Sequence, residues 1–275
     1  MPPAPERPAP PPARTRALVV GIVNVSADSF QAEGRHPDPA AAIDHGLRLL
    51  AEGADWLDVG GESTRPGAQA VDADEELRRV LPVVRALAAV GQVSVDTSKA
   101  RVAAAALRAG ARGINDVRGL EDPEMAAVSA DAACVVVMHS RGTPRDMSRL
   151  TTYDDLVAEV AQWLDARARR ARSAQVWIDP GLGFAKTAAQ SLALLQGVPT
   201  LVATGWPVYI GASRKSFIGH TLGVPDAADR LPGSLAAVAA AYQRGAAAFR
   251  VHDVAATVDA LRVWQAAASG RLGVD

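Results

Sequence analysis

Eight short apolar segments recur along this chain, and nearly all are separated by segments with helical character. The predicted strands span residues 17–25, 56–59, 92–95, 113–114, 133–138, 175–178, 207–210 and 248–249. A Gly-Ala pair joins a helix to the next strand at Gly53, Gly110 and Gly245, because glycine adopts the left-handed conformation beyond a helix end. Eight such units in about 260 residues are typical of a single-domain α/β protein, the (β/α)8 TIM barrel.

An open, doubly wound sheet is the alternative architecture. That fold usually carries a glycine-rich phosphate-binding turn, G-x-G-x-x-G, after its first strand. Here the first strand is followed by Asn-Val-Ser-Ala-Asp-Ser-Phe over residues 24–30, which lacks this pattern. The barrel is therefore the favoured prediction, with residues 16–275 forming it.

Composition limits the cellular setting and the partners. The chain has 275 residues, a formal net charge of −1 and a single cysteine, Cys134. This balance favours neither a nucleic-acid partner nor a membrane partner, and a lone cysteine fits the reducing cytoplasm. Residues 1–15 are rich in proline and lack the apolar stretch of a secretory signal, so we predict a disordered leader.

Polar side chains follow the predicted strands. They are Asn24, Glu62, Thr64, Arg65, Asp96, Asn115, His139, Asp179, Ser213, Lys215, Arg250 and His252. In a barrel the carboxyl ends of all strands meet at one mouth, where active sites form. Each polar group buried there without a partner would cost about 1–3 kcal/mol. The sequence therefore predicts either a polar ligand at the mouth or a dense internal network.

These side chains fall into two chemical groups. Asp96, Asn115 and Asp179 offer oxygen atoms that suit a flat heterocycle with several N–H donors. Cationic and amide side chains, notably Arg250, suit phosphate. Simpler roles stay open for each residue taken alone, because Asp96 could cap a helix, Asp179 could form a turn and Arg250 could pair with a neighbouring acid. Arg214 and Lys215 stand where a helix should begin, a position that repels cations and indicates a nearby anion or carbonyl.

Seven of these segments resemble the motifs of the dihydropteroate synthase family in order and spacing. They are residues 24–30, 58–67 (Asp-Val-Gly-Gly-Glu-Ser-Thr-Arg-Pro-Gly), 94–97, 114–116, 179–184 (Asp-Pro-Gly-Leu-Gly-Phe), 213–216 and 250–253. The resemblance implies a cytoplasmic, homodimeric transferase of folate biosynthesis and sulfonamide target. Such an enzyme joins 6-hydroxymethyl-7,8-dihydropterin diphosphate to 4-aminobenzoate, and releases 7,8-dihydropteroate and diphosphate.

The resemblance also implies site residues. The pterin diphosphate would contact Thr64, Asp96, Asn115, Met138, Asp179, Lys215, Arg250 and His252. The 4-aminobenzoate would contact Thr64, Arg65, Pro66, Phe184 and Ser213. Asn24 would hold a Mg2+ ion, and the catalytic residues would be Asp28, Lys215 and Arg250.

Two segments depart from the family pattern. Residues 26–34 read Ser-Ala-Asp-Ser-Phe-Gln-Ala-Glu-Gly in place of Thr-Pro-Asp-Ser-Phe-Ser-Asp-Gly-Gly, and Ser140-Arg141 replaces a common Met-Gln. A non-catalytic pterin-binding paralogue is therefore one alternative function. A methyltetrahydrofolate–corrinoid methyltransferase is a second. A Schiff-base aldolase that uses Lys215 or Lys99 is a third.

Overall fold

The computed structural model describes residues 16–25, 38–65 and 67–271. Its strands are β1 (Leu18–Asn24), β2 (Trp56–Gly60), β3 (Val93–Asp96), β4 (Gly113–Asp116), β5 (Cys134–Met138), β6 (Gln175–Asp179), β7 (Tyr209–Ile210) and β8 (Ala248–Val251). Within the described residues they form one parallel sheet in the order β6-β5-β4-β3-β2-β1-β8-β7. A parallel bridge between Ile178 and Val208 brings the two edges together and nearly closes the barrel, which confirms the predicted fold.

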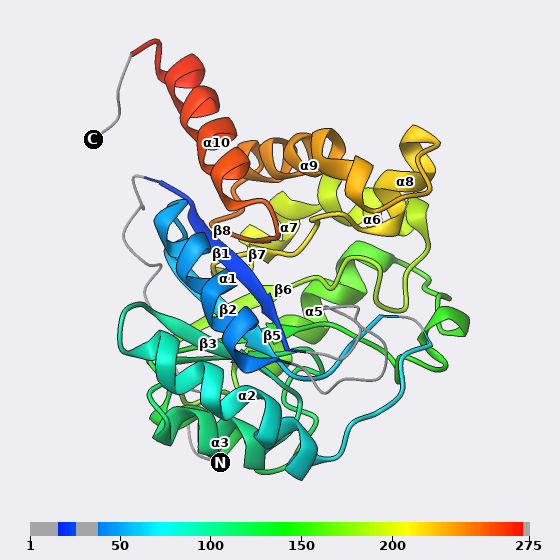
Figure 1. The fold of residues 1–275 in the computed structure, drawn as a ribbon. Coiled ribbons are helices and arrows are strands. Elements are labelled where there is room, and N and C mark those ends of the chain that lie inside the picture. Colours follow the sequence, from blue (N-terminus) through cyan, green and yellow to red (C-terminus); the bar gives the residue numbers. More distant parts are fainter. Residues whose placement is uncertain (1–15, 26–37, 66, 272–275) are drawn as a thin grey trace.

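Helices follow most of the strands and enclose the sheet (Figure 1). The α-helices are α1 (Pro39–Ala51), α2 (Ala73–Ala88), α3 (Ala100–Arg108), α4 (Met125–Val128), α5 (Leu156–Ala168), α6 (Ala188–Gln196), α7 (Val198–Val202), α8 (Ser216–Leu222), α9 (Leu231–Gln243) and α10 (Val254–Ser269). The described residues also form three short 3-10 helices, η1 (Ser129–Asp131), η2 (Met147–Arg149) and η3 (Ala228–Arg230). No helix in the described ranges combines the length and apolar character needed to cross a membrane.

The residues at the helix ends are those that stabilise a helix start or a turn. Asp38 caps α1 by accepting a hydrogen bond from the main-chain N–H of Ala40, and Pro39 occupies the first helical position. Gly53, Gly110 and Gly245 all have positive φ angles, of 100°, 111° and 99°. A residue with a side chain would be strained there, so glycine fixes these three helix-to-strand turns.

Two strands, β4 and β8, extend two residues further than predicted. β4 includes Asn115 and Asp116, and β8 includes Arg250 and Val251, whereas the sequence placed these residues just beyond the strands. A strand that ends in polar residues looks shorter than it is in a hydrophobicity pattern. In this structure the main chains of these end residues still pair with neighbouring strands. Their side chains consequently have the fixed orientation of strand residues rather than the freedom of a loop.

Strand register brings the polar ends to one level. Gly60 pairs with Asp96, Asp96 pairs with Asn115, and Met138 pairs with Asp179. Below this level the barrel interior is filled by a small apolar cluster of Val20, Cys134, Val136, Trp177, Tyr209 and Ala248. A larger cluster packs the outer faces of the strands against the helices. Because the lower interior is filled by apolar side chains, a polar ligand inside the barrel would lie at the mouth.

Candidate active site

A polar network crosses the upper barrel interior. The Nε atom of Arg250 in β8 donates to Oδ2 of Asp58 in β2 at 2.6 Å, and its terminal nitrogen donates to Oδ2 of Asp96 in β3 at 2.8 Å. Ser94 donates its hydroxyl to Asp58 at 2.6 Å, and Nδ2 of Asn115 donates to Asp58 at 2.9 Å. The strands β2, β3, β4 and β8 are thus joined through the fully buried carboxylate of Asp58.

Burial opposes both charges in the pair of Asp96 and Arg250. Desolvation raises the pKa of Asp96, although the cation of Arg250 opposes that shift. Desolvation disfavours the Arg250 cation, but Asp58 and Asp96 outweigh it, and the pKa of Arg250 is raised. Arg250 is therefore a permanent cation balanced by acids, one of the roles that the sequence left open for it.

Asp179 and Lys215 lie beside this network. A Cβ atom at Gly211 would lie 3.8 Å from Oδ2 of Asp179, 3.8 Å from Nζ of Lys215 and 4.0 Å from Cβ of Arg250, so these three side chains surround one glycine. Burial lowers the pKa of Lys215 to about 8, with Asp179 opposing the shift. The predicted meeting of Asp96, Asp179, Lys215 and Arg250 in one neighbourhood is confirmed.

The two cations at the start of α8 have separate roles. Lys215 donates to the main-chain oxygen of Leu182, in the loop after β6, as expected for a cation that meets carbonyl groups. Arg214, with a positive φ of 58°, turns away and forms an ion pair with Asp253. Only Lys215 of the two belongs to the site.

Ser213 and His252 form a pair at the ends of β7 and β8. The Oγ atom of Ser213 lies 3.0 Å from Nδ1 of His252 and accepts the main-chain N–H of His252 at 3.2 Å. Burial, followed by the charges of Arg250 and Arg214, lowers the pKa of His252 to about 3. Near pH 7 this histidine is neutral, so it can offer a hydrogen bond but no positive charge.

A cavity of about 100 Å3 opens from this network to the surface. Thr64, Asp96 and Phe184 line it together, and Nζ of Lys215 lies 4.8 Å from the centre of the Phe184 ring. Met138 is buried at the end of β5, and Asn24 ends β1. Arg65, in the loop after β2, is exposed. Asp28 and Pro66 lie outside the described residues.

The sequence interpretation missed two residues, Asp58 and Lys186, whereas it had already placed His139 at the mouth. Asp58 had a usable signal, because it is an acid within the apolar strand Trp56–Gly60. Lys186 and His139 form a buried pair in which Nζ of Lys186 lies 2.9 Å from Nδ1 of His139 and donates to the Phe184 carbonyl at 2.8 Å. Burial lowers the pKa of Lys186 to about 7. Burial and the Lys186 charge lower the pKa of His139 to about 2.

Substituting His139 should alter the pH dependence of stability. The pKa of His139 falls from an ordinary 6.5 to about 2, so below pH 6.5 the unfolded chain binds more protons than the folded chain. The stabilisation is complete above pH 6.5 and is lost as pH falls, by up to about 1.4 kcal/mol per pH unit. We expect His139→Gln to flatten that slope between pH 6 and 4 in urea unfolding. The exposed His220→Gln serves as the control, and equal slopes in both variants would contradict the assignment.

Comparison with known proteins agrees with this geometry. A family model described as pterin binding enzyme matches residues 20–252. Dihydropteroate synthase of Mycobacterium leprae is 48% identical, with 89% of this chain and 91% of that protein covered. Dihydropteroate synthase of Xanthomonas albilineans has been solved with 4-aminobenzoic acid (48% identity, TM-score 0.85, 93% and 94% coverage) and with 7,8-dihydropteroate (45%, 0.83, 93% and 95%). The chain belongs to the dihydropteroate synthase family of pterin-binding enzymes.

Proposed function

We propose that this chain condenses 6-hydroxymethyl-7,8-dihydropterin diphosphate with 4-aminobenzoate, and that it releases 7,8-dihydropteroate and diphosphate in folate biosynthesis. The observation that carries the proposal is the convergence of Asp96, Asp179, Lys215 and Arg250 at one mouth, in a chain 48% identical to a dihydropteroate synthase. High identity over nearly the whole chain favours this activity over the methyltransferase alternative.

The pterin ring would lie against the acids and the amide. Asn115 already uses its Nδ2 atom on Asp58, while its Oδ1 atom is buried and has no hydrogen-bond partner among the described residues. A buried acceptor without a partner is costly, so it supports a ligand that brings N–H groups. The Oδ1 atom of Asp179 accepts a hydrogen bond from the main-chain N–H of Gly181. Its Oδ2 atom lies on the side of Lys215 and is left for a ligand. Met138 would pack against the ring.

The diphosphate would lie toward β1 and β8. His252 would donate a hydrogen bond from its neutral ring, and Thr64 a hydroxyl. Arg250 would contribute positive charge, although its two acidic partners offset much of it. The amide oxygen of Asn24 suits a Mg2+ ion that takes most of its ligands from phosphates and water, and such an ion would neutralise the leaving group.

The arylamine would approach through the cavity that Thr64 and Phe184 line, with Arg65, Pro66 and Ser213 around it. Its nitrogen forms a bond to the exocyclic carbon of the pterin as the bond from that carbon to the diphosphate oxygen breaks, and the nitrogen then loses one proton. An arylamine needs no strong base for this step. Lys215 and Arg250 would stabilise the developing negative charge, and Asp28 would face the developing cation.

We also propose a cytoplasmic homodimer. The exposed apolar residues Leu192 on α6 and Leu222 on α8 lie on helices that pack together, and they provide surface for a second copy. We expect sedimentation equilibrium to give twice the mass of the chain. A mass of one chain at micromolar concentration would contradict the dimer.

Product detection tests the activity itself. The chain, incubated with pterin diphosphate, 4-aminobenzoate and Mg2+, should form 7,8-dihydropteroate in an amount that matches the diphosphate released, as measured by mass spectrometry. Tight binding of the pterin diphosphate without product would instead favour a non-catalytic paralogue. Trapping of substrate on Lys215 or Lys99 by borohydride would favour the aldolase.

Removing the side-chain charge of either Lys215 or Asp96, both partly buried, should lower turnover. We expect Lys215→Ala and Asp96→Ala each to reduce kcat/KM by about tenfold or more, because charge-assisted hydrogen bonds to the substrate are lost. Steady-state kinetics with both substrates measures the effect. Arg262→Ala, at an exposed position of α10, is the control. Near-wild-type kinetics in both site variants would refute the roles of Lys215 and Asp96.

A further inference from the structure

A second, larger cavity lies beside the mouth and outside the barrel interior. Its volume is about 220 Å3, and it is lined by Arg118, Glu121, Ser140, Arg141, Gly142, Trp163 and Arg167. Arg118, Ser140 and Gly142 also line the smaller cavity, so the two spaces adjoin. None of the residues proposed to bind the pterin or the arylamine lines the larger cavity. It is therefore a separate space with its own chemistry.

Arginine dominates the lining of this cavity. Arg118 is paired with Glu121 through its Nε atom, and Glu121 is the one acid among the lining residues. Arg141 is already engaged, because it donates to Glu159 at 2.9 Å and lies 3.8 Å from the centre of the Tyr153 ring. The guanidinium groups that retain capacity for a ligand are those of Arg118 and Arg167.

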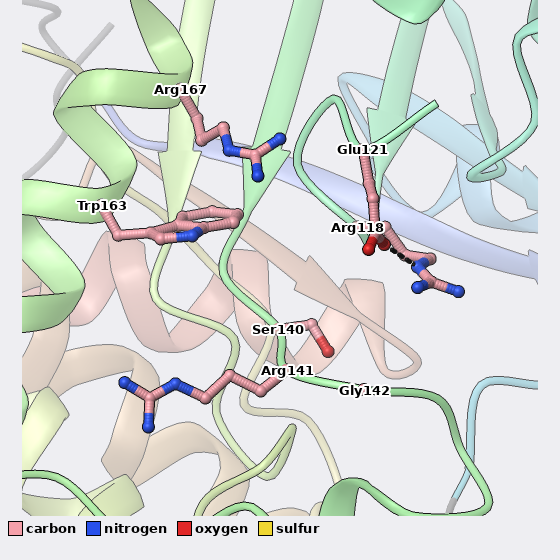
Figure 2. A pocket seen from close by; sticks show the side chains of 7 residues that line it. All are labelled: Arg118, Glu121, Ser140, Arg141, Gly142, Trp163 and Arg167. Atoms are coloured by element: carbon pink, nitrogen blue, oxygen red, sulfur yellow. Dashed lines mark hydrogen bonds and ion pairs between the residues drawn. The ribbon is translucent and has the colours of Figure 1, made fainter. Parts of the chain in front are cut away.

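Arg167 is a cation with no acidic partner among the described residues. One terminal nitrogen donates to the main-chain oxygens of Gly119 at 3.3 Å and Leu120 at 3.1 Å, and its guanidinium carbon lies 5.0 Å from the centre of the Trp163 ring. It forms no ion pair within the part of the chain that the structure describes. Figure 2 shows its guanidinium above the Trp163 ring, facing the loop that carries Arg118 and Glu121.

Other lining groups complement these cations. The hydroxyl of Ser140 has no hydrogen-bond partner among the described residues, and it lies on the opposite side of the Trp163 ring from Arg167 in Figure 2. Trp163 packs against His139 in a T-shaped arrangement, with 4.9 Å between ring centres. Donors outnumber acceptors here, and a planar guanidinium binds two oxygens of one anion at once.

We propose that this cavity binds a small anion that carries a phosphate or carboxylate group, held by Arg167 and Arg118. The Trp163 ring forms a flat apolar wall, and the volume leaves space for an organic part of the ligand beside it. The proposal is independent of the catalytic activity, because it concerns residues that contact neither proposed substrate.

Calorimetric titration of the full chain with inorganic phosphate and, separately, with succinate tests the site. We expect Arg167→Met to weaken one binding event about tenfold or more, the loss of a charge-assisted pair. Arg169→Met is the matched control, because Arg169 follows the same helix, pairs with Asp165 and does not line the cavity. Arg169→Met removes one positive charge, as Arg167→Met does, and should change the affinity for the anion less than twofold. Binding of either anion at the catalytic mouth should be unchanged in both variants.

Arg118→Met provides a second variant if Arg167→Met folds poorly, and it should weaken the same event. A loss seen with phosphate alone assigns the site to phosphate compounds, and a loss seen with succinate alone assigns it to carboxylates. Unchanged binding in both cavity variants would overturn the proposal. Equal losses in Arg167→Met and Arg169→Met would also overturn it, since the effect would then reflect overall charge.

Discussion

The ion pairs of Arg250 with Asp58 and Asp96 organise the centre of this molecule. They connect β8, β2 and β3 across the barrel interior, directly above an apolar layer that contains Val20 and Trp177. Burying such charges costs several kcal/mol per ion, and removing one partner of a buried pair typically destabilises a protein by about 3–5 kcal/mol. The barrel therefore contains a polar layer in which each charged side chain depends on its partners, and removing one of them would destabilise the fold.

The same network decides which polar atoms remain for a ligand. Asp58 uses both carboxylate oxygens within the protein, and Asn115 uses its amide nitrogen. The acceptors left for a ligand are the Oδ1 atom of Asn115 and one carboxylate oxygen each of Asp96 and Asp179, all on strands. A site built on strands keeps its acceptors in place before the substrate arrives, so little reorganisation is needed in the reaction.

Two lysines hold the loop after β6. Lys215 donates to the Leu182 carbonyl and Lys186 to the Phe184 carbonyl, while the Tyr153 hydroxyl donates to the carbonyl of Ala185, a residue with a φ of 50°. These contacts fix the Phe184 ring in the wall of the cavity. A strained residue such as Ala185 persists only where its surroundings impose the conformation, and such residues cluster at functional sites.

The sequence by itself determined the barrel and most of the residues at its mouth, because strand alternation, helix caps and glycine turns act over a few neighbouring residues. It did not reveal α7, since five residues are too few to display a helical period. Nor did it reveal that Arg250 pairs with Asp58, 192 residues away, or that Lys186 meets His139. Only the tertiary structure decided those partners and the arginine-lined cavity, because strand register and barrel closure bring distant side chains together, and neither is encoded by local pattern.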